Sequence, residues 1–224
     1  MRFLKILIGI ISLAAPWPMR RRMLVLFFGY KIHPTSWIGF SWIFPRRLVM
    51  MEHSVIGHLN VCKGLDLLEL SENSIIGNAN WITGYPTTRN DHFSHQPDRK
   101  CELILGEHVG VSSRHYFDCT QSIRIGKYST IGGIRSVFLS HSINFEQCKQ
   151  SSLPITVGDY CFVSTNCVVL GGSILPNRSV LGACSLLNKP FDLPCSLYGG
   201  VPAHFIKNYT PDYLYFSRQT GFVR

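Results

Sequence analysis

The chain has 224 residues, 46% of them hydrophobic and 16% charged, and its formal net charge is +9. It is too apolar and too weakly charged for a disordered chain, and its composition excludes collagen-like, coiled-coil and low-complexity proteins. Residues 1–51 hold eight basic and no acidic residues, whereas residues 52–224 hold 14 basic and 13 acidic ones, so the nearly neutral body lacks the basic stripes that a nucleic-acid partner requires.

Residues 1–30 form a basic, apolar N-terminal arm. Residues 4–15 are apolar except for Lys5, and a Pro-Trp-Pro turn, three arginines at 20–22 and a second apolar run at 23–30 follow. Twelve residues make about 18 Å of helix, short of the roughly 20 residues that cross a bilayer, and arginines directly after them disfavour a cleaved export signal. We expect a short helical arm that either contacts a membrane, with its arginines facing anionic lipid phosphates, or packs on the main domain or a neighbouring subunit.

The eight cysteines form no CxxC pair and their spacing is irregular. This argues against both a zinc site and a disulfide framework. We therefore expect reduced thiols and a cytoplasmic protein, which on the membrane alternative lies on the inner face of the cytoplasmic membrane.

Residues 31–207 are built on a six-residue period. Aliphatic residues recur without a slip at Val157, Val163, Val169, Leu175, Leu181 and Leu187, and small residues follow four positions later at Cys161, Cys167, Ser173, Ser179 and Ser185. Six residues fit neither an amphipathic helix nor a hairpin, but they fit one flat side of a triangular coil, a short strand followed by a turn. We expect an all-β solenoid with about seven eighteen-residue coils, whose open ends are covered by the arm and by the C-terminal tail at 208–224, chiefly residues 209–222.

Two segments interrupt the period. Residues 84–101 are polar and contain Asp91, His92, His95 and Asp98, but a His-x-x-His pair in a loop is a weak metal site, and we expect no metal. The second interruption follows Val137, runs to Pro154, and has His141 at its base. A loop that leaves a regular coil does not serve core packing and tends to carry function.

Two C-terminal segments carry a family resemblance. Residues 180–189 (VLGACSLLNK) resemble the last-coil pattern I-G-A-G-S-V-V-T-K, and residues 198–207 (YGGVPAHFIK) resemble the closing pattern G-G-x-P-A-K-x-I. Together with the period, they make residues 32–207 similar to the hexapeptide-repeat acyltransferases. The resemblance implies a left-handed parallel β-helix, a homotrimer, acetyl-CoA as donor, and O-acetylation of a saccharide, such as a surface polysaccharide or a lipid-linked glycan intermediate. A non-catalytic β-helix scaffold is the alternative.

The resemblance also implies roles for residues around the second interruption. A histidine ahead of a P-I-x-I-G-D restart, here PITVGD at 154–159, is the family's general base, so His141 is expected to take the proton of the attacking hydroxyl. Because the chain has no G-x-S-x-G motif, direct attack is preferred over an acyl-enzyme. Asn144 or Glu146 is expected to orient the imidazole. Arg114, His115 and Asp118 are expected to line the acceptor pocket or to assist His141, although His115 and Asp118 could equally be satisfied wall residues.

The donor site is expected along the coil face between subunits. The residues assigned to it by resemblance are Phe162, Ser164, Ala183, Ser185, Lys189 and Lys207, with Phe162 as a wall and the two lysines at the phosphates. His204 replaces the family's usual lysine. The polar loop at 84–101 is expected to cover the acceptor site.

Overall fold

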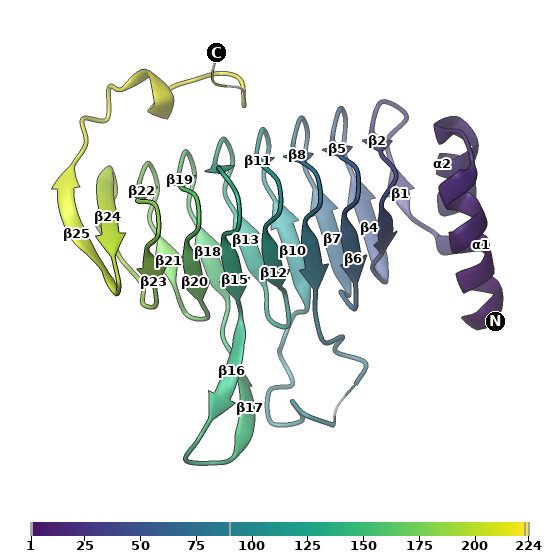
Figure 1. The fold of residues 1–224 in the computed structure, drawn as a ribbon, viewed down its shortest axis with the longest axis horizontal. Helices are drawn as coiled ribbons and strands as arrows, with labels where there is room; N and C mark the ends of the chain where they lie inside the picture. The colour runs from purple at the N-terminus through teal and green to yellow at the C-terminus, as the bar shows by residue number, and fades with distance from the viewer. Residues whose placement is uncertain (1, 90, 222, 224) are drawn as a thin grey trace.

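The computed structural model describes residues 2–89, 91–221 and 223; Met1, Asn90, Phe222 and Arg224, which include parts of the predicted arm and tail, lie outside the described residues. Two N-terminal helices, α1 (Arg2–Ala14) and α2 (Trp17–Phe28), precede a long prism of short strands (Figure 1). The prism is a left-handed parallel β-helix, which confirms the predicted all-β solenoid.

The three faces of the prism are parallel sheets, here called sheets A, B and C. Sheet A contains, in spatial order, β1 (Lys31–Ile32), β4 (Arg47–Met50), β7 (Leu67–Leu70), β10 (Glu102–Leu105), β13 (Ile123–Ile125), β18 (Ile155–Val157) and β21 (Ile174–Leu175). Sheet B contains β2 (Trp37–Ile38), β5 (Val55–Ile56), β8 (Ile75–Ile76), β11 (Gly110–Val111), β14 (Thr130–Ile131), β19 (Phe162–Val163), β22 (Val180–Leu181), β24 (Ser196–Gly200) and β25 (Ala203–Asn208).

Sheet C contains β3 (Trp42–Phe44), β6 (Val61–Lys63), β9 (Trp81–Thr83), β12 (Tyr116–Asp118), β15 (Val137–Leu139), β20 (Val168–Leu170) and β23 (Leu186–Leu187). A separate antiparallel hairpin, β16 (His141–Asn144) with β17 (Lys149–Ser152), projects from the prism below sheet C (Figure 1). Each face therefore has seven coil strands, as the period predicts.

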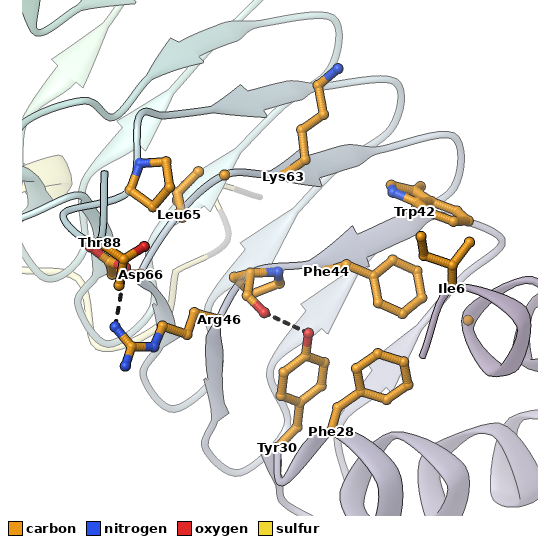
Figure 2. A pocket seen from close by; sticks show the side chains of 14 residues that line it. Ile6, Phe28, Tyr30, Trp42, Phe44, Arg46, Lys63, Leu65, Asp66 and Thr88 are labelled. Carbon is orange, nitrogen blue, oxygen red and sulfur yellow. Dashed lines mark hydrogen bonds and ion pairs between the residues drawn. The ribbon is translucent and has the colours of Figure 1, made fainter. Parts of the chain in front are cut away.

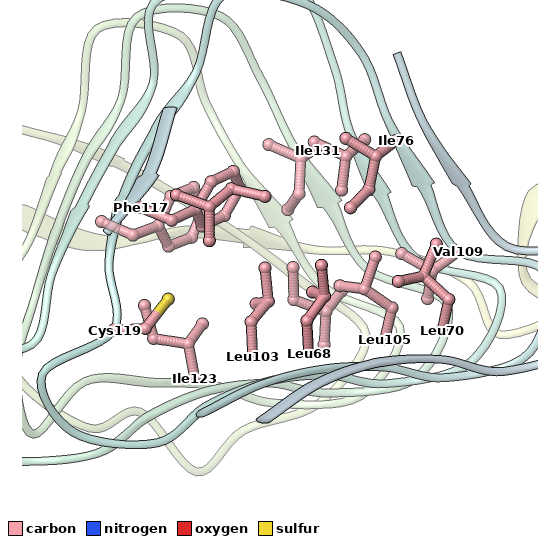
Figure 3. Close-up of a cluster of buried hydrophobic side chains, with 14 of the residues drawn as sticks. Leu68, Leu70, Ile76, Leu103, Leu105, Val109, Phe117, Cys119, Ile123 and Ile131 are labelled. Atoms are coloured by element: carbon pink, nitrogen blue, oxygen red, sulfur yellow. The ribbon is translucent and has the colours of Figure 1, made fainter. Parts of the chain in front are cut away.

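The aliphatic residues of the six-residue period point into the prism. All six aliphatic residues from Val157 to Leu187 are buried, and Phe117 and Phe138 are buried in the middle coils. Figure 3 shows part of this interior, where aliphatic side chains and Phe117 gather between the strands. Between each aliphatic residue and the following small residue the backbone takes a positive φ, for example 57° at Asn166 and 58° at Cys184. These left-handed residues turn each corner, and the small residue that follows leaves room for the next coil.

The cysteines occupy this interior or the surface as free thiols. Cys62, Cys101, Cys119, Cys161 and Cys167 are buried, and all eight are unpaired. Burial raises the pKa of Cys101 to about 12, so the interior cysteines act as small apolar residues.

The N-terminal arm packs on the first coil, one of the two expected placements. The Arg20 guanidinium is buried and donates to the carbonyls of Gly39 and Ser41, each at 2.6 Å, and burial lowers its pKa to about 10. Arg21 donates to the carbonyl of Ile32 at 2.7 Å. The expectation that all three arginines face lipid is therefore wrong for Arg20 and Arg21, because the open end of the first coil presents carbonyls that need donors. Within the described residues, neither helix has the length and apolarity to cross a membrane.

The far end of the prism is closed by the β24–β25 hairpin. Strand β24 continues sheet B parallel to β22, and β25 folds back antiparallel on it. The prediction that the tail covers this end is wrong: the tail, with a short 3₁₀ helix at Leu214–Phe216, turns back over sheet B, where the Tyr215 hydroxyl donates to the Cys161 carbonyl at 3.0 Å. The hairpin supplies the covering strand, which leaves the tail free to pack on a face.

Candidate active site

The side chains of His141 and Asp118 meet at the edge where sheet C turns toward sheet A. Strand β12 ends at Asp118, and the parallel register places Asp118 beside Leu139 of β15. His141, two residues after Leu139, consequently lies over the carboxylate, and its Nδ1 hydrogen-bonds Asp118 Oδ2. The Asp118 side chain is 5% exposed, whereas that of His141 is 40% exposed. The buried acid thus supports an imidazole that solvent and ligands can reach.

The Asp118 carboxylate is itself fixed. Its Oδ1 accepts hydrogen bonds from the Thr120 backbone N–H at 3.1 Å and from the Thr120 hydroxyl at 2.7 Å. The hydrogen bond to Asp118, together with its charge, raises the pKa of His141 above its ordinary value, although partial burial acts against this. Since the carboxylate holds the proton on Nδ1, the acceptor lone pair of the neutral ring is on Nε2.

A cavity of about 310 Å³ opens beside this pair. It is lined by Thr83, Gly84, Tyr85, His92, Phe93, Tyr116, Asp118, Thr120, His141 and Gln150. Tyr85, His92 and Phe93 come from the loop at 84–101, and Gln150 comes from the hairpin. The loop at 84–101, which is expected to cover the acceptor site, thus lies beside His141.

Two side chains of the loop tie it to the rest of the site. Gln96 donates to the Ser152 carbonyl at 3.1 Å and accepts from the Ser152 N–H at 3.1 Å and hydroxyl at 2.8 Å, which joins the loop to the base of the hairpin. Arg99 is buried and donates to the carbonyls of Tyr85 and Thr120, the latter at 2.6 Å. Hydrogen bonds therefore connect the loop to the hairpin and to Thr120, the residue that holds the Asp118 carboxylate.

An aromatic track leads along sheet C away from His141. The parallel register aligns Trp81 with Tyr116 and, beside them, Thr83 with Asp118. Neighbouring strands lie about 4.8 Å apart, the two rings are 49% and 36% exposed, and Thr83 Oγ1 is 3.0 Å from the Tyr116 hydroxyl. The Tyr116 ring therefore borders the cavity, and the Trp81 ring lies one strand further along the same face.

The same face holds a second cavity where sheet C meets the N-terminal arm. It has a volume of about 580 Å³, and Figure 2 shows aromatic side chains from the arm and the first coil on one side of it, with Arg46, Lys63 and Asp66 on the other. The Tyr30 hydroxyl donates to the Pro45 carbonyl at 2.6 Å, and Arg46 lies 3.8 Å from Asp66. Pro86 and Thr88 line it as well, so the loop at 84–101 borders both cavities.

The structure separates the other residues expected near His141. His115 is a buried wall residue: its Nδ1 accepts from the Ser136 N–H at 3.1 Å, its Nε2 lies 2.9 Å from the Ser112 hydroxyl, and burial lowers its pKa to about 4. Arg114 is exposed at the corner between sheets B and C, where its φ is 61°. Both precede β12, whereas Asp118 ends it, so they lie at the opposite edge of the face from His141.

The expectation that Asn144 or Glu146 orients the imidazole is wrong. Asn144 Oδ1 accepts from the Gln147 N–H at 3.0 Å, within the hairpin turn, and Glu146 is exposed there. Each hairpin residue extends about 3.4 Å further from the coil, so residues close in sequence leave the site. Asp118 supplies the contact instead.

The residues expected to hold the donor fall into four places. Ser164, Ala183 and Ser185 lie at the corner between sheets B and C, and the Ser185 hydroxyl accepts from the Gly200 N–H at 3.1 Å. Phe162 belongs to sheet B and lines an apolar cavity of about 500 Å³ with Tyr215 of the tail. Lys189 follows β23 near the other edge of sheet C, and Lys207 lies in β25. Sheet C thus separates the corner group from His141.

No three histidine, cysteine or acidic side chains gather at one point to hold a metal, in the part of the chain that the structure describes. His92 Nε2 lies 3.8 Å from Asp91, and its ring packs against Tyr85. His92 thus contributes to the cavity wall.

Sequence reasoning missed Gln96 and Arg99, because their partners lie 56 and 21 residues away in the chain. Thr120, only two residues after Asp118, was missed as well. It also missed Trp81 and Tyr116. Each precedes a buried residue of the repeat, Ile82 or Phe117, so aligning the coils on their inward residues would have placed both rings on the outer face.

No protein-family model matches the chain, and no curated protein matches its sequence. Solved structures do. A hexapeptide-repeat acetyltransferase from Vibrio cholerae O1 biovar eltor, complexed with acetyl-CoA, is 20% identical over 63% of this chain and 70% of that chain, with a TM-score of 0.51. A polysialic acid O-acetyltransferase is 15% identical over 80% and 84%, with a TM-score of 0.59. A Bacillus cereus N-acyltransferase, solved with a dTDP-amino sugar and CoA, is 11% identical over 80% and 84%, with a TM-score of 0.51. The chain shares their hexapeptide-repeat fold.

Proposed function

We propose that the protein is an acetyl-CoA-dependent O-acetyltransferase that acetylates a hydroxyl group of a saccharide. The observation that carries the proposal is the His141–Asp118 pair at the mouth of a cavity. A fixed, buried carboxylate behind a half-exposed imidazole is the arrangement that general-base catalysis needs. The N-acetyl variant is less favoured, because an amine nucleophile, once neutral, needs less help from a base than a hydroxyl does.

In the proposed step, the acceptor oxygen attacks the thioester carbonyl while its proton passes to His141 Nε2. The new C–O bond forms, the C–S bond breaks, and the imidazolium returns the proton to the CoA thiolate. Asp118 stays ionised throughout and stabilises the imidazolium. A base of this kind typically contributes about 10² to 10⁴ in rate.

The outer surface of sheet C supports a donor position on the C-terminal side of His141. Val168, Leu170 and Leu186 point outward from β20 and β23 and are half-buried, which gives an aliphatic strip between the corner group and His141. We assign the pantetheine chain of acetyl-CoA to this strip, with Ser164, Ala183 and Ser185 at one edge and Lys189 near the other. A neighbouring prism in a homotrimer would close the strip, and Phe162 and Lys207 would then act across that interface.

The opposite side of His141 supports a saccharide acceptor. Trp81 and Tyr116 offer flat rings to the C–H faces of sugar rings, and Thr83, His92 and Gln150 offer polar groups to hydroxyls. We assign to these two rings an acceptor that is a surface polysaccharide or a lipid-linked glycan intermediate. Donor and acceptor would thus approach the imidazole from opposite directions.

Acceptor-dependent release of CoA thiol tests the proposal. The full chain is incubated with acetyl-CoA and a panel of oligosaccharides, and thiol is measured with mass spectrometry of the products. We expect release with at least one glycan, a product heavier by one acetyl group, and a lower KM for longer glycans than for their monosaccharides. No release with any glycan would favour a non-catalytic β-helix scaffold.

A further inference from the structure

The two N-terminal helices present apolar side chains to solvent. On α1, Ile6, Leu7, Ile10 and Ile11 are exposed, and their spacing places them on one side of the helix. The opposite side faces the prism: a side chain at Gly9 would meet the Phe44 ring at 2.9 Å. The outer side of α1 is thus apolar, although no described residue of the chain covers it.

Helix α2 repeats the pattern independently. Met19, Leu26 and Phe27 are exposed, Leu26 by 77%, whereas Arg20 and Leu24 are buried; Met19 and Leu26 lie on the outer side of the helix and Phe27 lies at its flank. Arg22 is the exposed member of the three arginines and shares the outer side with Met19 and Leu26.

Basic side chains outnumber acidic ones around these outer sides, although Asp66 pairs with Arg46, and Glu52 and Glu72 line the groove beside α2. Lys31, Arg46 and Arg47 are exposed on the first coil next to the arm, and residues 1–51 contain no acidic residue. A protein partner would bring the hydrogen-bonding rim that accompanies an apolar core, whereas an anionic bilayer offers phosphates and an apolar interior in one plane. The charge therefore favours lipid.

We propose that residues 6–27 dock the protein on the surface of an anionic lipid bilayer, with the outer sides of α1 and α2 in the headgroup boundary. Arg20 and Arg21 anchor the arm to backbone carbonyls of the first coil, so the whole prism is held in a fixed orientation. The arm lies at the end of the prism remote from β25 (Figure 1). In this orientation, the cavity lined by Ile6 and Phe28 (Figure 2) lies at the end of sheet C next to the membrane.

Vesicle flotation with the full chain tests the docking. Wild type is mixed with phosphatidylcholine vesicles with or without 30% phosphatidylglycerol (about the anionic content that gives a strong surface potential), beside two double variants, I10Q/I11Q and L26Q/F27Q. The matched control is L214Q, since Leu214 is 86% exposed on the tail at the other end of the prism. Thermal unfolding confirms that each variant folds.

We expect wild type and L214Q to float with the anionic vesicles, and each arm variant to lose at least tenfold in bound fraction. R22Q and added salt should weaken binding severalfold. Equal recovery of wild type in the soluble fraction with and without vesicles would overturn the proposal. A second result would also overturn it: wild type does not bind vesicles, and the arm variants have a smaller oligomer mass than wild type. The outer sides of α1 and α2 would then contact a second copy of the chain. Thiol release with a soluble acceptor is independent of all these outcomes.

Discussion

The imidazole of His141 is oriented by a carboxylate that lies 23 residues earlier in the chain. In a β-helix, the neighbours of a residue are its counterparts one coil away, not the residues beside it in sequence. Asp118 is the counterpart of Leu139, two residues before His141, whereas Asn144 and Glu146 leave with the hairpin. Proximity in sequence therefore predicted the wrong partner, although the position of His141, the proposed base, at the start of the interruption is visible in the sequence.

The raised pKa of His141 predicts the pH dependence of the reaction. Because the carboxylate stabilises the imidazolium, the ring is protonated, and unable to act as a base, up to a pH above its ordinary pKa of about 6.5. We expect kcat/KM to rise about tenfold per pH unit below that pKa and to level off above it. In D118N the rising limb should move to lower pH and the plateau should fall by about 10² or more.

The control for D118N is E146Q, whose side chain is exposed at the hairpin turn. Its pH profile should match that of wild type. An unchanged profile in D118N would contradict the role of Asp118.

At the scale of elements, the loop at 84–101 and the hairpin act together through Gln96. Replacing Gln96 by Leu removes three hydrogen bonds to Ser152 and leaves that backbone unpaired. We expect KM for the acceptor to rise about tenfold while acetyl-CoA binding, measured by calorimetry, stays unchanged. A weaker affinity for acetyl-CoA instead would show that the loop serves the donor.

The coil strands make a second prediction, because neighbouring residues face opposite ways. Leu175 is fully buried, whereas Ile174 in the same strand is 42% exposed. L175A should lower the free energy of unfolding by about 2–5 kcal/mol, and I174A by about 1 kcal/mol or less. Urea unfolding measures both. Equal losses would mean that the six-residue period does not mark the interior.

At the scale of the whole molecule, the features that could be predicted from the sequence are those that repeat from coil to coil. The coil count, the inward residues and the corners follow from a repeat that each coil imposes on the next. The path of the loop, the tail on sheet B and the buried Arg20 and Arg99 depend on single contacts between distant segments, and no pattern in the sequence encodes these. The site therefore combines a predictable histidine with supports that only the folded chain reveals.

The net charge also takes its meaning from the whole molecule. The basic quarter of the chain forms one end of a nearly neutral prism. There Arg20 and Arg21 donate hydrogen bonds to backbone carbonyls, whereas Arg22 is exposed to solvent. The site lies on the middle coils, away from this end. The basic residues and the proposed active site thus lie on separate parts of the fold.

The most direct test of the central claim is the turnover of H141A together with its affinity for acetyl-CoA. We expect kcat to fall at least about a hundredfold, since the hydroxyl loses its base, while calorimetry gives the wild-type dissociation constant for acetyl-CoA. Near-normal turnover in H141A, with acetyl-CoA bound as before, would contradict the account.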